Sequence, residues 1–124
     1  MDKPLLLIVE DEAPLREALV ETLSQDFKVL SAINGELGLN LAINSQPDLI
    51  ILDAMMPIMG GLDMLTALRS NKVWGTEAKV LLLTNVGNIE SSEKINSDPN
   101  VTVLIKSNVQ LEDVLKKIRE ILKS

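Results

Sequence analysis

The amino-acid sequence predicts a doubly wound α/β fold, in which a five-stranded parallel sheet of order 2-1-3-4-5 carries five helices on its two faces. Short apolar runs of strand length alternate along the chain with segments in which apolar residues recur every three or four positions, as in amphipathic helices. The runs LLLIV, LIIL and VLLL are apolar throughout, which is typical of central strands that are buried on both faces.

The apolar runs predict strands at residues 5–9, 28–33, 49–52, 80–83 and 101–105. The periodic segments predict helices at residues 14–25, 36–44, 62–69 and 111–122. A further helix is expected within residues 88–96, where Ile89 and Ile95 are the apolar anchors. Pro14 suits the first turn of its helix, and the pair Gly60-Gly61 marks a loop after the third strand.

Composition and charge narrow the chemistry that is available to this chain. Its 124 residues contain no internal repeat or linker, so we expect one domain over residues 1–124 with no output domain attached. The absence of cysteine and histidine excludes thiol chemistry, Ser-His-Asp triads and histidine-ligated zinc. A net charge of -6 argues against direct nucleic-acid binding, and no apolar run is long enough to span a membrane. We therefore expect a cytoplasmic domain that uses carboxylates, hydroxyls, lysines and a hard metal ion.

Polar residues stand at the carboxyl ends of the predicted strands. Glu10 and Asp11 follow the first strand, Asp53 closes the third, Thr84 the fourth and Lys106 the fifth. In an open parallel sheet these positions share one edge, where ligands bind, and Asp11 would face Asp53 across the crevice. Crowded carboxylates need a compensating cation, and Mg²⁺ prefers such oxygen ligands. A carboxylate beside this ion can accept a phosphoryl group, whose charge Lys106 and Thr84 could help to neutralise.

The same residues resemble the receiver domain of two-component response regulators. Four motifs occur in the order of that family: IVEDE at residues 8–12, LDAMMPIMGG at 52–61, LLLTN at 81–85 and LIKS at 104–107. The resemblance extends over residues 5–122 and implies a flavodoxin-like, single-domain response regulator that is a phosphoprotein in phosphorelay signal transduction. Glu12, which also belongs to the first motif, is better explained as part of a solvated helix N-terminus.

The resemblance assigns a role to each residue at the predicted site. Asp53 would be the phosphoacceptor, which forms an aspartyl phosphate with a phosphoryl group from a histidine kinase or a histidine phosphotransfer protein. Asp11 would bind Mg²⁺ directly, Glu10 would join the metal site through water, and the backbone carbonyl of Met55 would be a further ligand.

The resemblance also implies how the signal would be passed on. Thr84 would hydrogen-bond the phosphate, and Lys106 would pair with it. The switched surface would involve the fourth strand and the fifth helix, and it would bind a separate output protein or a second copy of the chain. We expect no enzyme activity beyond the chain's own phosphoryl transfer and dephosphorylation. The dephosphorylation should be slow, because the apolar Met55 and Val86 cannot orient an attacking water.

Departures from the family pattern leave alternatives open. Val103 stands where the family usually has an aromatic residue, Ser107 where it has proline, and Asn85 where it has a small residue. These positions favour a degenerate receiver that acts as a phosphorylation-independent binding module. A small aspartyl-phosphate phosphatase is a weaker alternative, since Met55 stands where such enzymes generally have a second aspartate. Ser107 and Gln110 also have the S-x-x-Q spacing of a helix capping box.

Overall fold

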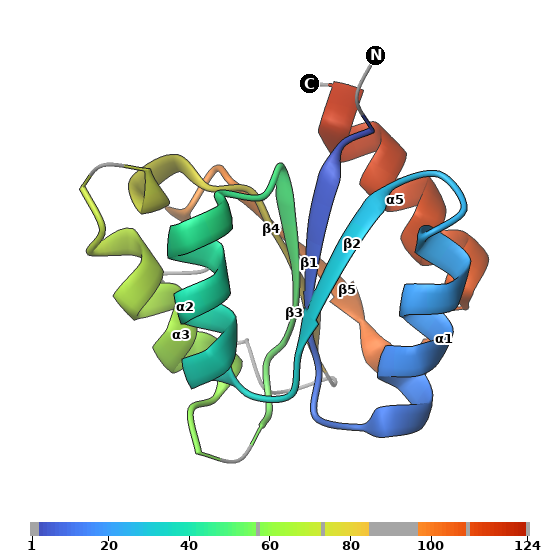
Figure 1. The fold of residues 1–124 in the computed structure, drawn as a ribbon, viewed down its shortest axis with the longest axis horizontal. Coiled ribbons are helices and arrows are strands. Elements are labelled where there is room, and N and C mark those ends of the chain that lie inside the picture. Colours follow the sequence, from blue (N-terminus) through green and yellow to red (C-terminus); the bar gives the residue numbers. More distant parts are fainter. Residues whose placement is uncertain (1–2, 57, 73, 85–96, 109, 124) are drawn as a thin grey trace.

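One parallel sheet forms the centre of the molecule in the computed structural model, which describes residues 3–56, 58–72, 74–84, 97–108 and 110–123 (Figure 1). Its strands are β1 (Leu5–Val9), β2 (Lys28–Ala32), β3 (Leu49–Asp53), β4 (Val80–Thr84) and β5 (Val101–Ile105). They pair in parallel in the order β2-β1-β3-β4-β5, which confirms the predicted strand order. The predicted strand bounds differ from the observed ones by one residue at most.

The described residues contain four α-helices rather than the five predicted: α1 (Ala13–Leu23), α2 (Gly35–Ser45), α3 (Gly61–Arg69) and α5 (Leu111–Lys123). The helix expected within residues 88–96 lies outside the described residues. Figure 1 shows α1 and α5 on one face of the sheet and α2 and α3 on the other. None of the described helices is both long and apolar enough to cross a membrane.

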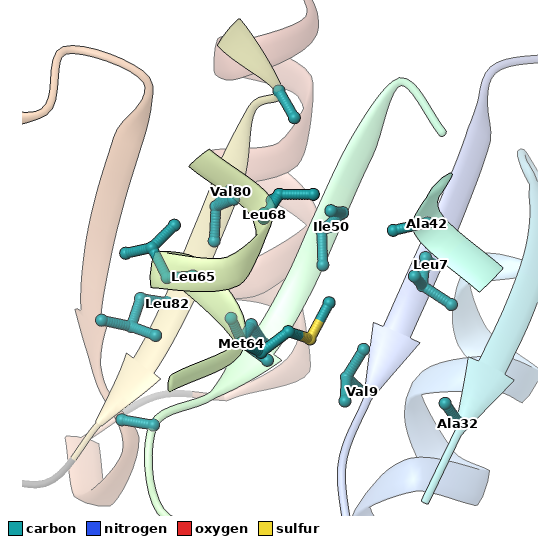
Figure 2. Packing of buried hydrophobic residues seen from close by; sticks show 13 residues of the cluster. Leu7, Val9, Ala32, Ala42, Ile50, Met64, Leu65, Leu68, Val80 and Leu82 are labelled. Carbon is teal, nitrogen blue, oxygen red and sulfur yellow. The ribbon is translucent and has the colours of Figure 1, made fainter. Parts of the chain in front are cut away.

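Alternating side chains of the central strands build a separate apolar core on each face of the sheet. Leu7 and Val9 of β1 belong to the core beneath α2 and α3, whereas Leu6 and Ile8 belong to the core beneath α1 and α5. Figure 2 shows the first of these cores, where Met64 and other side chains of α3 pack over β3 and β4. Because both faces are covered, β3 and β4 are buried along their whole length, as their uninterrupted apolar runs predicted.

Helix α2 approaches the sheet closely because of one glycine. A Cβ atom at Gly38 would lie 2.7 Å from Cγ2 of Val9 and 3.2 Å from Sδ of Met64, so a side chain there has no room. Asn34 caps the helix, because its side chain accepts a hydrogen bond of 2.9 Å from the backbone N–H of Leu37. These two residues set where α2 starts and how near to β1 it lies.

The start of α5 differs from the capping box that Ser107 and Gln110 predicted. Ser107 lies in a short 3₁₀-helix, η2 (Lys106–Asn108), and α5 begins only at Leu111. The backbone N–H of Gln110 donates to Oδ2 of Asp113 at 3.0 Å. The side chain of Asp113, rather than that of Gln110, therefore caps the start of α5. The prediction was wrong because a 3₁₀ turn, which the pattern did not reveal, separates the strand from the helix.

Candidate functional site

The carboxyl ends of β1 and β3 bring three acidic side chains together. Val9 pairs with Leu52 in the parallel register, so the residues that follow them, Glu10 and Asp53, are neighbours. Glu10, Asp11 and Asp53 each offer a carboxylate oxygen, and these oxygens all lie within 4.8 Å of one another. Glu10 and Asp53 are buried and Asp11 is half-buried. The structure therefore assembles the three carboxylates that the sequence placed at this edge.

Lys106 comes from the end of β5 and supplies a positive charge within this cluster. Its Nζ lies 3.0 Å from Oδ2 of Asp53, 3.2 Å from Oε1 of Glu10 and 3.2 Å from Oε1 of Glu12. Burial disfavours the charged ammonium, but its hydrogen bond to Asp53 and the surrounding carboxylates outweigh burial and raise the pKa of Lys106 above its usual value. One ammonium therefore holds three acidic side chains in place.

The carboxyl group of Glu10 has a strongly raised pKa. Burial is the main cause that raises the pKa of its carboxyl group from 4.5 to about 8, and the nearby Asp53 carboxylate adds to the effect. Its Oε2 accepts a hydrogen bond from the backbone N–H of Glu12, whereas its buried Oε1 has the ion-pair distance to Lys106 but no hydrogen bond. A divalent cation would stabilise a buried carboxylate oxygen that lacks a hydrogen bond and lies next to two other carboxylates.

Asp53 is held at both carboxylate oxygens. Oδ1 accepts a hydrogen bond of 3.1 Å from the backbone N–H of Met55, and Oδ2 accepts one of 3.0 Å from Lys106. The loop after β3 packs closely against the end of that strand at Gly61. The N–H of Gly61 donates to the carbonyl of Ala54, and a Cβ atom at Gly61 would collide with the carbonyl oxygen of Asp53. The side chain of Met55 is 60% exposed, so its backbone rather than its side chain is positioned at the site.

Thr84 lies at the same edge of the sheet. Its backbone pairs with that of Ile105, the residue before Lys106, and Leu83 pairs with Asp53. Thr84 is 1% exposed and thus forms part of the buried side of the site. Asn85, the last residue of the third motif, and Val86, which was expected to slow dephosphorylation, lie outside the described residues.

Two contacts at the site were not expected from the sequence. Glu12, interpreted as a solvated helix N-terminus, is exposed but pairs with Lys106. Arg16 donates from Nη1 to the backbone carbonyls of Glu10 at 3.0 Å and of Asp11 at 3.3 Å, and so fixes the acidic loop to α1. No sequence signal marks Arg16, because an arginine in the first turns of a helix is ordinarily a solvated surface residue.

The chain belongs to the response regulator receiver domain family, whose model matches residues 6–119. This match confirms the resemblance that the four motifs indicated. Response regulator MprA of Mycobacterium sp. (strain KMS) is 32% identical over 120 residues, an alignment that covers 95% of this chain and 50% of MprA. The chain thus spans about half the length of this curated relative.

Solved structures agree with this family and with a flavodoxin-like fold. The chemotaxis protein CheY4 of Vibrio cholerae superposes with a TM-score of 0.84 at 25% identity, over 96% of this chain and 98% of CheY4. The response regulator TrrA of Thermotoga maritima, solved in complex with Mg²⁺ and BeF, has a TM-score of 0.77 at 28% identity, over 98% of this chain and 99% of TrrA. The acidic cluster described above therefore lies in a receiver domain of two-component signalling.

Proposed function

We propose that this chain is a phospho-accepting receiver in which Mg²⁺-dependent phosphorylation of Asp53 switches a surface that includes β4 and α5. The observation that carries the proposal is the buried Asp53 carboxylate, which lies 3.0 Å from the Lys106 ammonium and has oxygens of two further carboxylates within 4.8 Å. Glu10, Asp11, Asp53 and the backbone carbonyl of Met55 would hold Mg²⁺, which supplies positive charge that offsets the phosphoryl oxygens.

The side chains at this edge suit a direct phosphoryl transfer. A carboxylate oxygen of Asp53 attacks the phosphorus of a phosphohistidine, the new O–P bond forms as the P–N bond breaks, and the imidazole nitrogen keeps the electron pair. The Lys106 ammonium, 3.0 Å from Oδ2, is placed to pair with the transferred phosphoryl group, and the Thr84 hydroxyl would hydrogen-bond it. Positioning and charge neutralisation supply most of the catalysis in such a transfer.

The family of this chain indicates its phosphodonor. The phosphoryl group would come from a histidine kinase or a histidine phosphotransfer protein in the cytoplasm, because the given chain has no histidine that could itself serve as the donor. Phosphorylation adds about 1.5 to 2 negative charges at one point, which is enough to bias a two-state surface. The reader of that surface would be a separate output protein or a second copy, with no direct contact to nucleic acid or membrane.

A phosphodonor assay tests the proposed function. The chain is incubated with acetyl phosphate and Mg²⁺, and its intact mass is measured. We expect the mass of one phosphoryl group to be added, and this gain to be lost with EDTA or with Asp53→Asn. The control variant Asp63→Asn, which changes an exposed aspartate of α3, should gain mass like the wild type. No gain in the wild type, or a gain that persists in Asp53→Asn, would contradict the proposal.

A degenerate receiver that binds its partner without phosphorylation is the second candidate. It is favoured by Val103 in β5, where the family usually has an aromatic residue, and by Ser107 in η2, where it usually has proline. The phosphodonor assay separates this candidate from the first. The enzyme alternative, a small aspartyl-phosphate phosphatase, would require turnover of a phosphate ester, which we expect to be absent because Met55 offers no acid beside Asp53.

A further inference from the structure

Arg16 of α1 contacts the backbone of all three acidic residues that follow β1. Its Nη1 donates to the carbonyl oxygen of Glu10 at 3.0 Å and to that of Asp11 at 3.3 Å. Its backbone N–H donates to the carbonyl oxygen of Glu12 at 2.9 Å, in the first turn of the helix. One half-buried residue therefore holds three consecutive carbonyl groups of the acidic loop.

The peptide group between Asp11 and Glu12 connects Arg16 to a carboxylate of the acidic cluster. Its carbonyl oxygen accepts from Nη1 of Arg16, and its N–H donates to Oε2 of Glu10 at 3.2 Å. A trans peptide group is planar, so the direction of its carbonyl fixes the opposite direction of its N–H. The contact with Arg16 thereby keeps the N–H of Glu12 pointed toward the Glu10 carboxylate.

Arg16 acts on backbone oxygens and not as the counter-charge of a carboxylate. Within the described residues, the arginines that form ion pairs are Arg69 and Arg119. The counter-charge of the acidic cluster comes from Lys106. Glu12, the residue before α1, makes no side-chain capping hydrogen bond, so the start of this helix does not hold the loop in that way.

We propose that Arg16 is a positioning residue for the cation site, whose guanidinium fixes the loop so that the carboxylates of Glu10 and Asp11 lie beside Asp53. This inference rests on the proposed function, which places Mg²⁺ among these carboxylates. Replacing a residue that orients metal ligands typically weakens metal binding by about 10- to 100-fold. The positive charge of Arg16 itself repels a cation, so positioning and charge change the Mg²⁺ affinity in opposite directions.

Mg²⁺ titration of the unphosphorylated chain, followed through amide shifts in ¹H–¹⁵N NMR spectra, tests the inference. We expect Arg16→Met to weaken Mg²⁺ binding by about tenfold or more, whereas the loss of a positive charge alone would strengthen it. The control Arg119→Met removes the same charge from an exposed position of α5 and should bind Mg²⁺ like the wild type.

The outcomes of this titration distinguish the inference from the proposed function. Mg²⁺ binding by Arg16→Met that equals or exceeds that of the wild type would overturn the inference alone. A wild-type chain that does not bind Mg²⁺ would contradict the proposed function and the inference together.

A variant that keeps the charge separates the bridge between carbonyls from the charge itself. In Arg16→Lys the ammonium lies closer to the backbone than Nη1 does, so it cannot reach both carbonyl oxygens. We therefore expect Arg16→Lys to bind Mg²⁺ more weakly than the wild type as well. An affinity equal to that of the wild type would overturn the positioning role.

Hydrogen exchange of the Glu12 amide reports the positioning without Mg²⁺. In EDTA, this amide should exchange faster in Arg16→Met, because its hydrogen bond to Glu10 is weakened. The lost positive charge alone would instead slow the exchange, which hydroxide catalyses at neutral pH. The amide of Leu37, which donates to Asn34 at the start of α2, should exchange as in the wild type if the variant is folded. Unchanged or slower exchange at Glu12 would overturn the proposal.

Discussion

In solutions without Mg²⁺, we expect Glu10 to make the protein less stable as the pH rises. Its pKa is about 8 in the folded chain and 4.5 ordinarily, so between these values the folded state binds a proton that the unfolded state has lost. The free energy of unfolding therefore decreases with increasing pH across this window and levels off above it. The physical cause is the burial of a carboxylate beside the Asp53 carboxylate, where Mg²⁺ is absent.

Replacing Glu10 by Gln should remove this pH dependence. Without Mg²⁺ at pH 8, we expect Glu10→Gln to increase the free energy of unfolding by about 1–3 kcal/mol, because the neutral amide needs no counter-charge. Urea denaturation in EDTA at several pH values measures both the increase and the flatter pH profile. The control Glu17→Gln, at an exposed position of α1, should behave like the wild type. Equal pH profiles for wild type and Glu10→Gln would show that Glu10 is not the responsible group.

Lys106 stabilises the acidic cluster through its positive charge. Because its pKa is raised, its contribution is fully present below the usual value of 10.5 and is lost only as the pH rises through the higher folded-state value. In EDTA at pH 7, Lys106→Met should lower the free energy of unfolding by about 1–3 kcal/mol, since the buried Asp53 carboxylate would lose its cation. Mg²⁺ should then stabilise the variant more than it stabilises the wild type, which thermal unfolding with and without Mg²⁺ measures.

The matched control for this variant is Lys117→Met. Lys117 pairs with Glu120 on the surface of α5, where an ion pair contributes little. We expect its unfolding to remain close to that of the wild type in both solutions. A comparable loss of stability in both lysine variants would contradict the special role given to Lys106.

Helix α2 shows how packing on the sheet overrides helix propensity. Alanine is favoured over glycine inside a helix by about 1 kcal/mol, yet a Cβ atom at Gly38 would lie 2.7 and 2.9 Å from the two methyl groups of the buried Val9. Val9 is stiff and lies in the core, so it cannot move aside easily. The close approach of α2 to β1 therefore depends on this glycine.

We expect Gly38→Ala to lower the free energy of unfolding by about 1–3 kcal/mol, as in other overpacked cores. Chemical denaturation followed by circular dichroism measures the change. Asn44→Ala is the control within the same helix, because its exposed side chain leaves only the small gain in helix propensity. A Gly38→Ala variant that is more stable than the wild type would mean that α2 can shift away from β1.

Among the elements, long periodic segments were predicted well and short turns were not. The apolar positions of α5 follow the helical period, and its observed bounds, Leu111–Lys123, extend the predicted ones by one residue. The 3₁₀-helix Gly75–Glu77 and the turn at Ser107 have no such signal, since three residues are too few to show a period. The capping hydrogen bond of Asp113 depended on where that turn ended.

The whole molecule should respond to Mg²⁺ through the acidic cluster. A cation that binds only the folded state stabilises it by about 2.7 kcal/mol at a hundred times its Kd. We therefore expect the melting temperature to rise with Mg²⁺ concentration for the wild type and to change little for Asp11→Asn. Asp63→Asn, outside the cluster, should follow the wild type. An equal Mg²⁺ response of Asp11→Asn and the wild type would mean that the cation binds elsewhere.

The sequence alone established the strands, most helices and the kind of chemistry at their ends. Strands that are buried on both faces must be apolar throughout, and the polar residues that close them can then be read directly from the chain. Four separate motifs in one order also indicated the family. Each of these signals is local, because it depends on neighbouring residues and on the period of one element.

The tertiary structure decided which of these residues meet and how strongly they perturb one another. The register between β1 and β3 places Glu10 beside Asp53, and β5 brings Lys106 to them from 53 positions farther along the chain. The burial of Glu10 and the contact of Arg16 with its loop also became visible only there. Such contacts depend on how twisted strands and packed helices lie in space, which no local period encodes.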